Sequence, residues 1–301
     1  MTEDPRGTKI KVGPDGYVQL VDFMGNDKTI VNAARVSFGK NNDEPLSEKD
    51  RKLIHYLMHH RHTTPFEHVT LTFKVRVPMD TWRQWVRHRT ASINEYSTRY
   101  SEAIDSMATT APGKWRKQAE DRRQGSSDEI FSLEDGTVLS EQEAGLQALA
   151  REVYKHRLEM GVAREQARKD LPLSTYTEAY WTVNLHNLFH FLELRMSADA
   201  QCEIHEYAVA LAVLVKKVCP EACSAFWRQR MDIVHLNGLQ RQVLYHLDNK
   251  YKLFIPESEV KETFERVKRY YGGIARDEEY REILDFLDNI GVLEEPEEEE
   301  E

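Results

Sequence analysis

The chain has 301 residues, which is enough for one large domain or for one domain with an appendage. Hydrophobic residues make up 40% of it and charged residues 31%, and the lack of any long apolar run excludes a membrane-spanning helix. The net charge of −10 argues against nonspecific binding of DNA or RNA, which needs a broad basic face, although seven glutamates among residues 294–301 contribute most of that charge.

The cysteines and the N-terminus indicate the cellular compartment. Cys202, Cys219 and Cys223 are too few for a disulfide framework, and we expect them to be buried packing residues. The N-terminal residues lack the apolar core of a signal peptide. We therefore expect a cytoplasmic protein.

Alternation and helical spacing predict the elements of the first part of the chain. Residues 17–23 alternate apolar and polar side chains and predict a strand, which is followed by a short helix over residues 26–36. Residues 47–60 predict an amphipathic helix whose first residue, a serine, can cap it. Residues 68–77 have the clearest strand pattern of the chain, and a helix over residues 81–86 comes next.

The rest of the chain is predicted to be mainly helical. Residues 113–143 turn polar around a Glu-Asp-Gly-Thr turn signal and predict a surface excursion. A strand is predicted over residues 176–183, and Asp199 is expected to cap the helix that ends before Pro220. Helices are predicted over residues 147–160, 162–170, 185–195, 199–218, 258–271 and 277–289.

A short basic segment carries the clearest functional signal. Arg83 and Arg87 lie four residues apart on one face of the predicted helix, where like charges repel by roughly 0.2–0.5 kcal/mol. His88 and Arg89 add further hydrogen-bond donors without a neighbouring acid. Arginines often cover a surface or pair with distant carboxylates, and that interpretation stays open for these side chains taken alone.

The polar run that follows favours a ligand site. Its polar side chains cannot all be buried without partners, and they are Ser92, Asn94, Glu95, Ser97 and Arg99. Arginine binds phosphate through two parallel hydrogen bonds, while asparagine and glutamate suit a base or a ribose edge. The segment therefore predicts a loop wrapped around a small anionic ligand such as a nucleotide.

Two other functions are compatible with parts of this pattern. A non-catalytic nucleotide- or RNA-binding module would account for the basic loop, although the aromatic platform of common RNA-binding modules is missing. A metal-dependent nucleotide hydrolase would use histidines at helical spacing, which are His55, His59 and His62, or His186 and His190. No HExxH pattern or cysteine pair supports a metal site, so we expect no bound metal. The absence of GxGxxG and Walker patterns disfavours a doubly wound dehydrogenase.

Residues 87–99 read RHRTASINEYSTR and resemble the RHRxxSxNxxSxR signature of flavin-dependent thymidylate synthases. Seven spaced positions match, which is far more specific than a single glycine motif. The segments VDFMGND, AARVSFGK, HTTPFEH, ARKDLPL, YWTVN and LELRMSADAQCEI are also similar to segments of that family. The resemblance covers roughly residues 15–225, without the polar excursion.

By this resemblance the chain would convert dUMP to dTMP, with methylenetetrahydrofolate as one-carbon donor and NADPH as reductant through bound FAD. It implies an α+β fold with a mixed sheet flanked by helices, to which the chain adds a helical C-terminal extension. Residues 1–225 would form the flavin- and dUMP-binding catalytic domain, residues 226–293 the extension and residues 294–301 an acidic disordered tail. It also implies a homotetramer with active sites at subunit interfaces, small-molecule substrates, and no nucleic-acid or membrane partner.

The resemblance also implies the site residues. Arg195 matches the arginine that activates the uracil ring, and a cation there would stabilise negative charge that develops on the ring. The residues implied to bind dUMP are Arg83, Gln84, Glu95, Tyr96, Ser97, Thr98, Arg99, Arg195 and, from a neighbouring subunit, Arg168. The residues implied to bind FAD are Ser37, His62, Thr64, Glu67, Arg87, His88, Arg89, Asn94, Glu95, Asn184, His186 and His190.

Residues 226–293 lie outside the resemblance. Their two predicted helices carry apolar stripes, which are Phe264, Val267 and Tyr271, and Ile283, Phe286, Leu287 and Ile290. Burial of each large side chain is worth roughly 1.5–3 kcal/mol, and two short helices alone make a poor core. We therefore expect the stripes to dock on the catalytic domain or on a neighbouring subunit as structural elements. A lid or regulatory element is the alternative.

Overall fold

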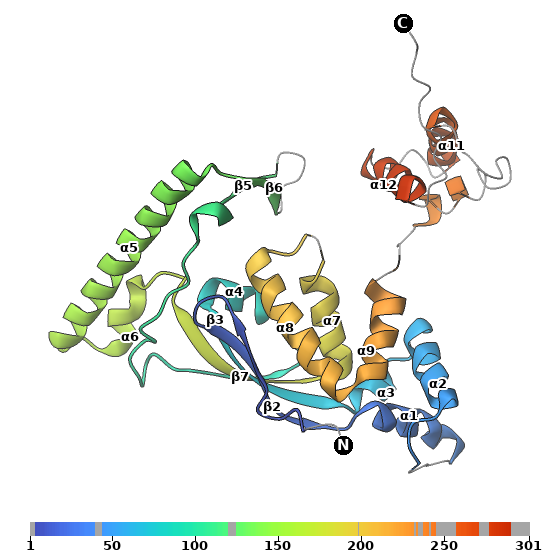
Figure 1. The fold of residues 1–301 in the computed structure, drawn as a ribbon, viewed down its shortest axis with the longest axis horizontal. Coiled ribbons are helices and arrows are strands. Elements are labelled where there is room, and N and C mark those ends of the chain that lie inside the picture. The colour runs from blue at the N-terminus through green and yellow to red at the C-terminus, as the bar shows by residue number, and fades with distance from the viewer. Residues whose placement is uncertain are drawn as a thin grey trace, which may run out of the picture. The chain divides into compact units, whose positions relative to one another are not determined.

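The computed structural model describes residues 4–39, 44–119, 125–197, 199–231, 233, 237–240, 242–244, 257–270 and 277–289 (Figure 1). The chain divides into two compact units, Met1–Met231 and Asp232–Glu301. The first unit continues past residue 225, where the predicted catalytic domain ends, and includes the π-helix η4 (Trp227–Met231). None of the described helices is long and apolar enough to cross a membrane.

A five-stranded sheet lies at the centre of the first unit, in the order β1–β2–β3–β7–β4. The strands are β1 (Lys9–Val12), β2 (Gly16–Met24), β3 (Thr70–Pro78), β7 (Tyr176–Asn184) and β4 (Ser92–Glu95). The predicted α+β class is confirmed. The sheet that the resemblance implied to be mixed is antiparallel in all of its described pairings. Strand periodicity could not correct that expectation, because it identifies strands without giving their direction.

Strand β4 corrects the predicted loop at the signature. Its four residues are exposed and pair with the outer side of β7, from Ser92 opposite Thr182 to Glu95 opposite Ala179. A short polar edge strand has no buried face, so its sequence carries no alternation from which a strand could be predicted. The pairing fixes the backbone of the signature on the sheet before the chain continues into a loop.

One face of the sheet is covered by α4 (Met79–Trp85), α7 (Leu185–Arg195) and α8 (Cys202–Val218), as Figure 1 shows. Helix α8 packs on β1 and β2, while α4 contacts β3 and β7. Gln201 is the N-cap of α8, so the predicted cap, Asp199, lies before the helix in a turn. Helix α9 (Pro220–Phe226) follows and packs against α2.

The remaining helices of the N-terminal part lie at one end of the sheet (Figure 1). They are α1 (Asp27–Arg35), η1 (Val36–Phe38), α2 (Glu48–His59) and α3 (Thr64–Glu67). The predicted serine cap of α2 is confirmed, because Ser47 accepts a hydrogen bond from Asp50 N and Asp50 accepts one from Ser47 N. This reciprocal pair satisfies two backbone donors at the start of the helix.

The predicted polar excursion contains regular structure. It holds η2 (Pro112–Lys114), the hairpin of β5 (Arg116–Gln118) and β6 (Ser126–Ile130), and the start of the long helix α5 (Leu133–Glu159). Gly136, taken from the sequence as a turn residue, is buried inside α5. A Cβ atom there would lie 2.0 Å from the carbonyl oxygen of Pro112, so the glycine allows α5 to approach η2 closely.

Two short helices and an aromatic cluster complete the first unit. The predicted helix over residues 162–170 consists of α6 (Arg164–Ala167) and η3 (Arg168–Asp170). Trp85, Trp181 and Phe191 are fully buried, and their ring centroids lie 4.9–5.2 Å apart. These contacts pack α4, β7 and α7 against one another, and so fix the position of α7 relative to the sheet.

The second unit contains α11 (Glu257–Tyr270) and α12 (Asp277–Asn289). The predicted apolar stripes are buried within this unit, apart from Tyr271 and Ile290, which lie outside the described residues. The buried cluster comprises Leu239, Val243, Val260, Phe264, Val267, Ile283 and Leu287, with Phe286 packed against it. A third segment therefore joins the two helices in a small core. The docking of this unit on the catalytic domain or on a neighbouring subunit stays a prediction.

Candidate active site

Helix α7 carries side chains on which the site is built. Strand β7 leads directly into it, and Asn184 caps its first turn. The side-chain oxygen of Asn184 accepts hydrogen bonds from Asn187 N at 2.9 Å and from Asn187 Nδ2 at 2.8 Å. The amide oxygen of this predicted FAD ligand is thus used by the helix cap. His186, His190 and Arg195 lie on the helix that Asn184 starts.

Three neighbouring pockets lie along α7, and each is lined in part by residues of this helix. The α2–α7 pocket has a volume of about 240 Å³, and the β7–α7 pocket one of about 310 Å³. The hairpin cleft, of about 800 Å³, lies between the β5–β6 hairpin and the turn from α7 to α8. Asn187 and His190 line the first two pockets, while Leu194 and Arg195 line the last two. One helix therefore contributes to three adjoining spaces.

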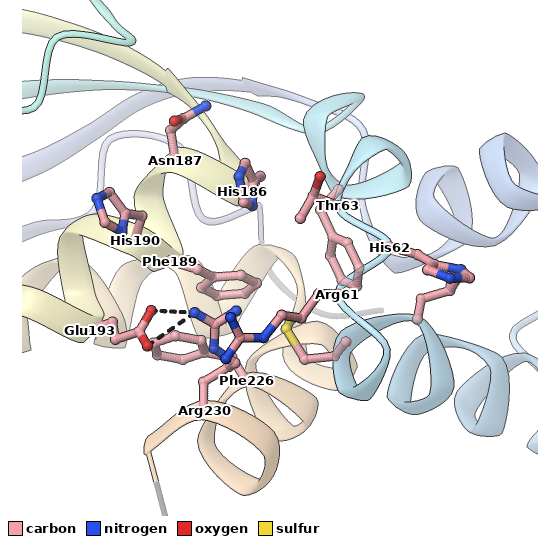
Figure 2. A pocket seen from close by; sticks show the side chains of 13 residues that line it. Arg61, His62, Thr63, His186, Asn187, Phe189, His190, Glu193, Phe226 and Arg230 are labelled. Carbon is pink, nitrogen blue, oxygen red and sulfur yellow. Dashed lines mark hydrogen bonds and ion pairs between the residues drawn. The ribbon is translucent and has the colours of Figure 1, made fainter. Parts of the chain in front are cut away.

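The α2–α7 pocket combines aromatic rings with positive charge (Figure 2). Phe189 and Phe226 stack with ring centroids 4.5 Å apart and an interplanar angle of 4°. Arg230 Nη2 donates to both carboxylate oxygens of Glu193, at 3.0 and 2.7 Å. Arg61 lines the same pocket and has no hydrogen-bond or ion-pair partner among the described side chains. Two guanidinium groups against one carboxylate suit an anionic aromatic ligand.

Three predicted flavin ligands meet in this pocket. His62, His186 and His190 line it, and Figure 2 shows His186 and His190 together on its α7 side. Burial lowers the pKa of His186 more than the nearby carboxylate of Glu67 raises it. The His186 imidazole is therefore neutral at pH 7 and can both donate and accept a hydrogen bond.

The β7–α7 pocket brings the signature to the predicted catalytic arginine. Arg195 Nε donates a hydrogen bond to His88 Nε2 at 3.1 Å. Burial, together with the charges of Arg195 and His190, lowers the pKa of His88 to about 4. Arg87 and Arg89 also line the pocket, and neither guanidinium group has a hydrogen-bond or ion-pair partner in the described part of the chain. Their positive charges are available to a ligand.

Part of the predicted dUMP set lies in a separate loop cluster after β4. Arg168 donates to the hydroxyl of Thr98, and Arg99 Nε pairs with Glu165 Oε2 at 3.1 Å. Arg168 therefore lies beside the signature of its own chain. None of the three pockets along α7 includes this cluster, whereas Gln84 lines the hairpin cleft.

Several other predicted residues are exposed. The Glu95 carboxylate accepts a hydrogen bond from the Thr177 hydroxyl at 2.8 Å, and the Tyr96 hydroxyl donates to Glu102 O at 2.7 Å. The predicted residues that are exposed and outside the three pockets are Ser37, Thr64, Glu67, Arg83, Asn94, Glu95, Tyr96 and Arg99. Ser97 is half-buried at the loop cluster.

Sequence reasoning missed two charged residues of the α2–α7 pocket. Glu193 on α7 and Arg230 on η4 are separated by 37 positions and pair only in the fold. Arg230 also lies beyond the segment that resembles the family. The sole local signal is the basic, aromatic-flanked sequence FWRQR, and it does not identify a partner.

A third missed residue, Arg61, has an unusual backbone. Its φ of 57° is left-handed, a conformation in which non-glycine residues are disfavoured. Arg61 N donates to Met58 O at 3.2 Å and His62 N donates to Leu57 O at 2.9 Å, which is the Schellman pattern that ends a helix. Glycine is usual at this position, so an arginine that lines a pocket suggests selection for its charge.

Two of the other histidines and two of the three cysteines have structural surroundings. His55 Nε2 is hydrogen-bonded to Glu221 at 2.9 Å, and His59 Nδ1 to Gln229 at 3.0 Å. The described residues contain no group of three or more histidine, cysteine, aspartate or glutamate side chains placed to hold a metal ion. Cys219 and Cys223 are buried as predicted. The prediction is wrong for Cys202, the exposed first residue of α8, which lines the hairpin cleft.

The fold and the pockets define an α+β protein with a cationic, aromatic-lined site for small anionic ligands. Residues 19–221 match the family described as "Thymidylate synthase complementing protein". The chain belongs to the flavin-dependent thymidylate synthases. The predicted family and activity are confirmed: the protein is an enzyme of thymidylate synthesis that depends on a flavin and acts on small molecules.

Known relatives and solved structures support this membership. A flavin-dependent thymidylate synthase of Thermus thermophilus is 45% identical over 235 residues, which are 78% of this chain and 84% of that protein. The enzyme of Treponema denticola is 41% identical over 241 residues, or 79% and 89% of the two chains. The structure of the UMP/dUMP methylase PolB from Streptomyces cacaoi bound with 5-Br dUMP superposes with a TM-score of 0.65 at 36% identity. The match covers 73% of this chain and 98% of that one.

Substitution of Arg61 separates backbone strain from ligand binding. We expect Arg61→Gly to raise the free energy of unfolding by about 0.5–1 kcal/mol, because glycine adopts the left-handed conformation without a Cβ clash. Arg61→Ala keeps the strain and removes the same charge. Both variants should bind the flavin about tenfold more weakly, as measured by titration of the apoprotein with FAD. Equal unfolding temperatures for the two variants would contradict the strain argument.

Two truncations test the role of η4. A chain that ends at Met231 keeps Phe226 and Arg230, and we expect it to retain bound flavin. A chain that ends at Ala225 loses both residues, and so loses the ring stack with Phe189 and the ion pair with Glu193. Its unfolding temperature should fall by about 5–10 °C relative to the longer truncation, with weaker flavin binding. Calorimetry and flavin absorbance on both chains measure this, and identical behaviour would show that η4 contributes nothing to the pocket.

Proposed function

We propose that this enzyme methylates dUMP reductively to dTMP, with methylenetetrahydrofolate as one-carbon donor and NADPH as reductant through bound FAD. The observation that carries the proposal is the meeting of Arg87, His88, Arg89 and Arg195 in one pocket, with two guanidinium groups that lack a partner among the described residues. Such groups bind phosphate and other anions through paired hydrogen bonds. The 5-Br dUMP bound to the methylase PolB supports the same substrate class.

The residues of the two pockets beside α7 fit a flavin dinucleotide. Arg87 and Arg89 would bind its phosphates, while His62, His186 and His190 would contact the remainder from the α2–α7 pocket. The unpaired Nε of Arg230 is buried in that pocket and lacks an acceptor among the described residues. Bound FAD would supply the hydride that the methyl group needs. The further FAD contacts of Ser37, Thr64, Glu67, Asn94, Glu95 and Asn184 belong to the same proposal.

Arg195 would act on the uracil ring. Its Nε is used by His88, so the two terminal nitrogens remain to donate to a ring oxygen. Positive charge held there stabilises negative charge on the oxygen as the ring is attacked or reduced. In this role Arg195 is catalytic, and Gln84, which lines the same hairpin cleft, would orient the base.

The division of the dUMP residues between two places supports a homotetramer with shared sites. Arg195 and Gln84 line the hairpin cleft, while Arg99 and Arg168 belong to the loop cluster. A site completed by the loop cluster of a second subunit would bring both sets to one nucleotide. The dUMP set is completed by Arg83, Glu95, Tyr96, Ser97 and Thr98. Free cysteines in the described chain support a cytoplasmic location.

The test is a spectrum followed by an assay. The purified full-length chain should show flavin absorbance that bleaches with NADPH, and should form dTMP only when dUMP and methylenetetrahydrofolate are both present. UMP in place of dUMP measures how strictly the sugar is recognised. A colourless protein that binds dUMP without turnover would instead favour the alternative, a non-catalytic nucleotide-binding module.

A further inference from the structure

The contact between Arg195 and His88 fixes the protonation of the imidazole. Arginine has donors but no acceptor, so the Nε–H of Arg195 requires a free lone pair on His88 Nε2 at 3.1 Å. The ring proton must then lie on Nδ1. An imidazolium ion would present a donor to a donor, with two positive charges in contact, and could not make this bond.

The imidazole is held by the protein core. His88 N donates to Trp85 O at 3.0 Å, and the ring packs edge-on against Phe191, with centroids 4.7 Å apart. Phe191 is fully buried and packs in turn against Trp85 and Trp181. The position of His88 Nε2 is therefore set by the rigid junction of α4, β7 and α7.

The pairing leaves the charge of Arg195 uncompensated. No carboxylate forms an ion pair with Arg195 in the part of the chain that the structure describes. A carboxylate in the place of His88 would orient the guanidinium equally well but would neutralise it. A neutral imidazole orients the guanidinium and leaves its full positive charge for the substrate.

We propose that His88, as a neutral Nδ1–H imidazole, is a positioning residue that fixes the Arg195 guanidinium toward the uracil ring. The proposal rests on the proposed function, because it assigns the way in which the catalytic arginine is held. It adds to the flavin contact that the resemblance gives His88. Histidine would thus serve two groups with its two nitrogens, since Nε2 faces Arg195 and Nδ1–H remains to donate.

The surroundings keep His88 neutral over the working range. Arg195 and His190 from α7 face it, Arg87 and Arg89 flank it in the chain, and the β7 residues of the pocket carry no charge. Burial, followed by Arg195 and His190, holds the pKa of His88 at about 4, below the ordinary 6.5. His88 is therefore protonated, and its contact with Arg195 lost, only in strongly acidic solution.

Two substitutions at position 88 test the acceptor. In His88→Gln a side-chain oxygen can take the place of Nε2, whereas His88→Leu has a similar size and no acceptor. With FAD and dUMP at saturation, we expect His88→Gln to keep kcat within about tenfold of the wild type. We expect His88→Leu to lose about 100-fold, the cost of a misplaced catalytic group. His88→Leu with bound flavin and a kcat within twofold of the wild type would overturn the proposal.

A double-substitution cycle separates positioning from flavin binding. If His88 acts through Arg195, adding His88→Leu to Arg195→Ala should change kcat by less than about twofold, although each alone lowers it strongly. Independent, multiplying effects would overturn the proposal, because they would assign the loss to the flavin.

Histidine tautomers provide a test that needs no turnover. In the full-length wild type with ¹⁵N-labelled histidine, the signals that vanish in His88→Gln should be those of an Nδ1–H imidazole that does not titrate between pH 6 and 8. An Nε2–H tautomer or an imidazolium ion would overturn the assignment. A chain without flavin or dTMP formation would contradict the proposed function, and this measurement would still decide the state of His88.

Discussion

Replacing Arg195 with alanine is expected to leave flavin bound while the rate of dTMP formation falls by about 10²–10³-fold. Arg195 lines the pocket at the signature and the hairpin cleft, so it is placed to reach a ligand that lies between them. Its loss removes donors for the ring oxygen. Neither buried cysteine can substitute by attacking the ring, because burial raises the pKa of both Cys219 and Cys223.

Matched variants make this result interpretable. Arg195→Lys keeps the charge but has no Nε to donate to His88, so it should recover only a small part of the lost rate. Arg228→Ala removes an arginine on η4 that lines none of the three pockets along α7, and should leave the rate unchanged. Single-turnover rates with FAD-loaded protein, together with flavin absorbance, distinguish chemistry from cofactor loss. Arg195→Ala with a rate near that of the wild type would remove Arg195 from the catalytic role.

The sequence predicted those parts of the protein that local patterns determine. Alternation located β2 and β3, and helical spacing with a serine cap located α2. A strand was also predicted where β7 lies. The family resemblance assigned both His88 and Arg195 to the active site, although they are 107 positions apart. Only such a resemblance could supply that long-range relation, since neither residue has a local pattern that points to the other.

The errors arose where the fold overrides local signals. Strand β4 is polar and exposed, so its sequence does not alternate. Gly136 was interpreted as a turn residue, but a glycine is needed at this position because α5 packs closely on η2. The pair of Glu193 and Arg230 forms only when η4 folds back on α7. Tertiary contacts of this kind leave no trace in local sequence patterns.

Asp50 is the buried charge whose removal should cost the most stability. Its side chain is fully buried at the start of α2, where it caps the helix through Ser47 N at 2.8 Å. It also pairs with Arg35 at 2.5 Å and Lys28 at 3.6 Å, both from α1. We expect Asp50→Asn to lower the free energy of unfolding by about 2–3 kcal/mol, because Arg35 and Lys28 lose their counter-charge and the Nζ atom of Lys28 is itself buried. Asp50→Ala should lose a further ~1 kcal/mol, since it also removes the cap.

The pH dependence of this loss identifies its electrostatic origin. Burial by itself raises the pKa of Asp50, but hydrogen bonds from Ser47 and the charges of Arg35 and Lys28 outweigh it and lower the pKa below 3.8. A carboxylate with a lowered pKa stabilises the fold fully above the pKa of the unfolded chain, and this stabilisation is lost as the pH falls through the folded value. The difference in the free energy of unfolding between the wild type and Asp50→Asn should therefore be constant near neutral pH and shrink below about pH 4.

Glu48→Gln is the control, an exposed substitution in the same helical turn. Its free energy of unfolding should stay within about 0.5 kcal/mol of the wild-type value at every pH. Denaturant unfolding at several pH values measures all three proteins, and a difference that does not depend on pH would assign the loss to packing.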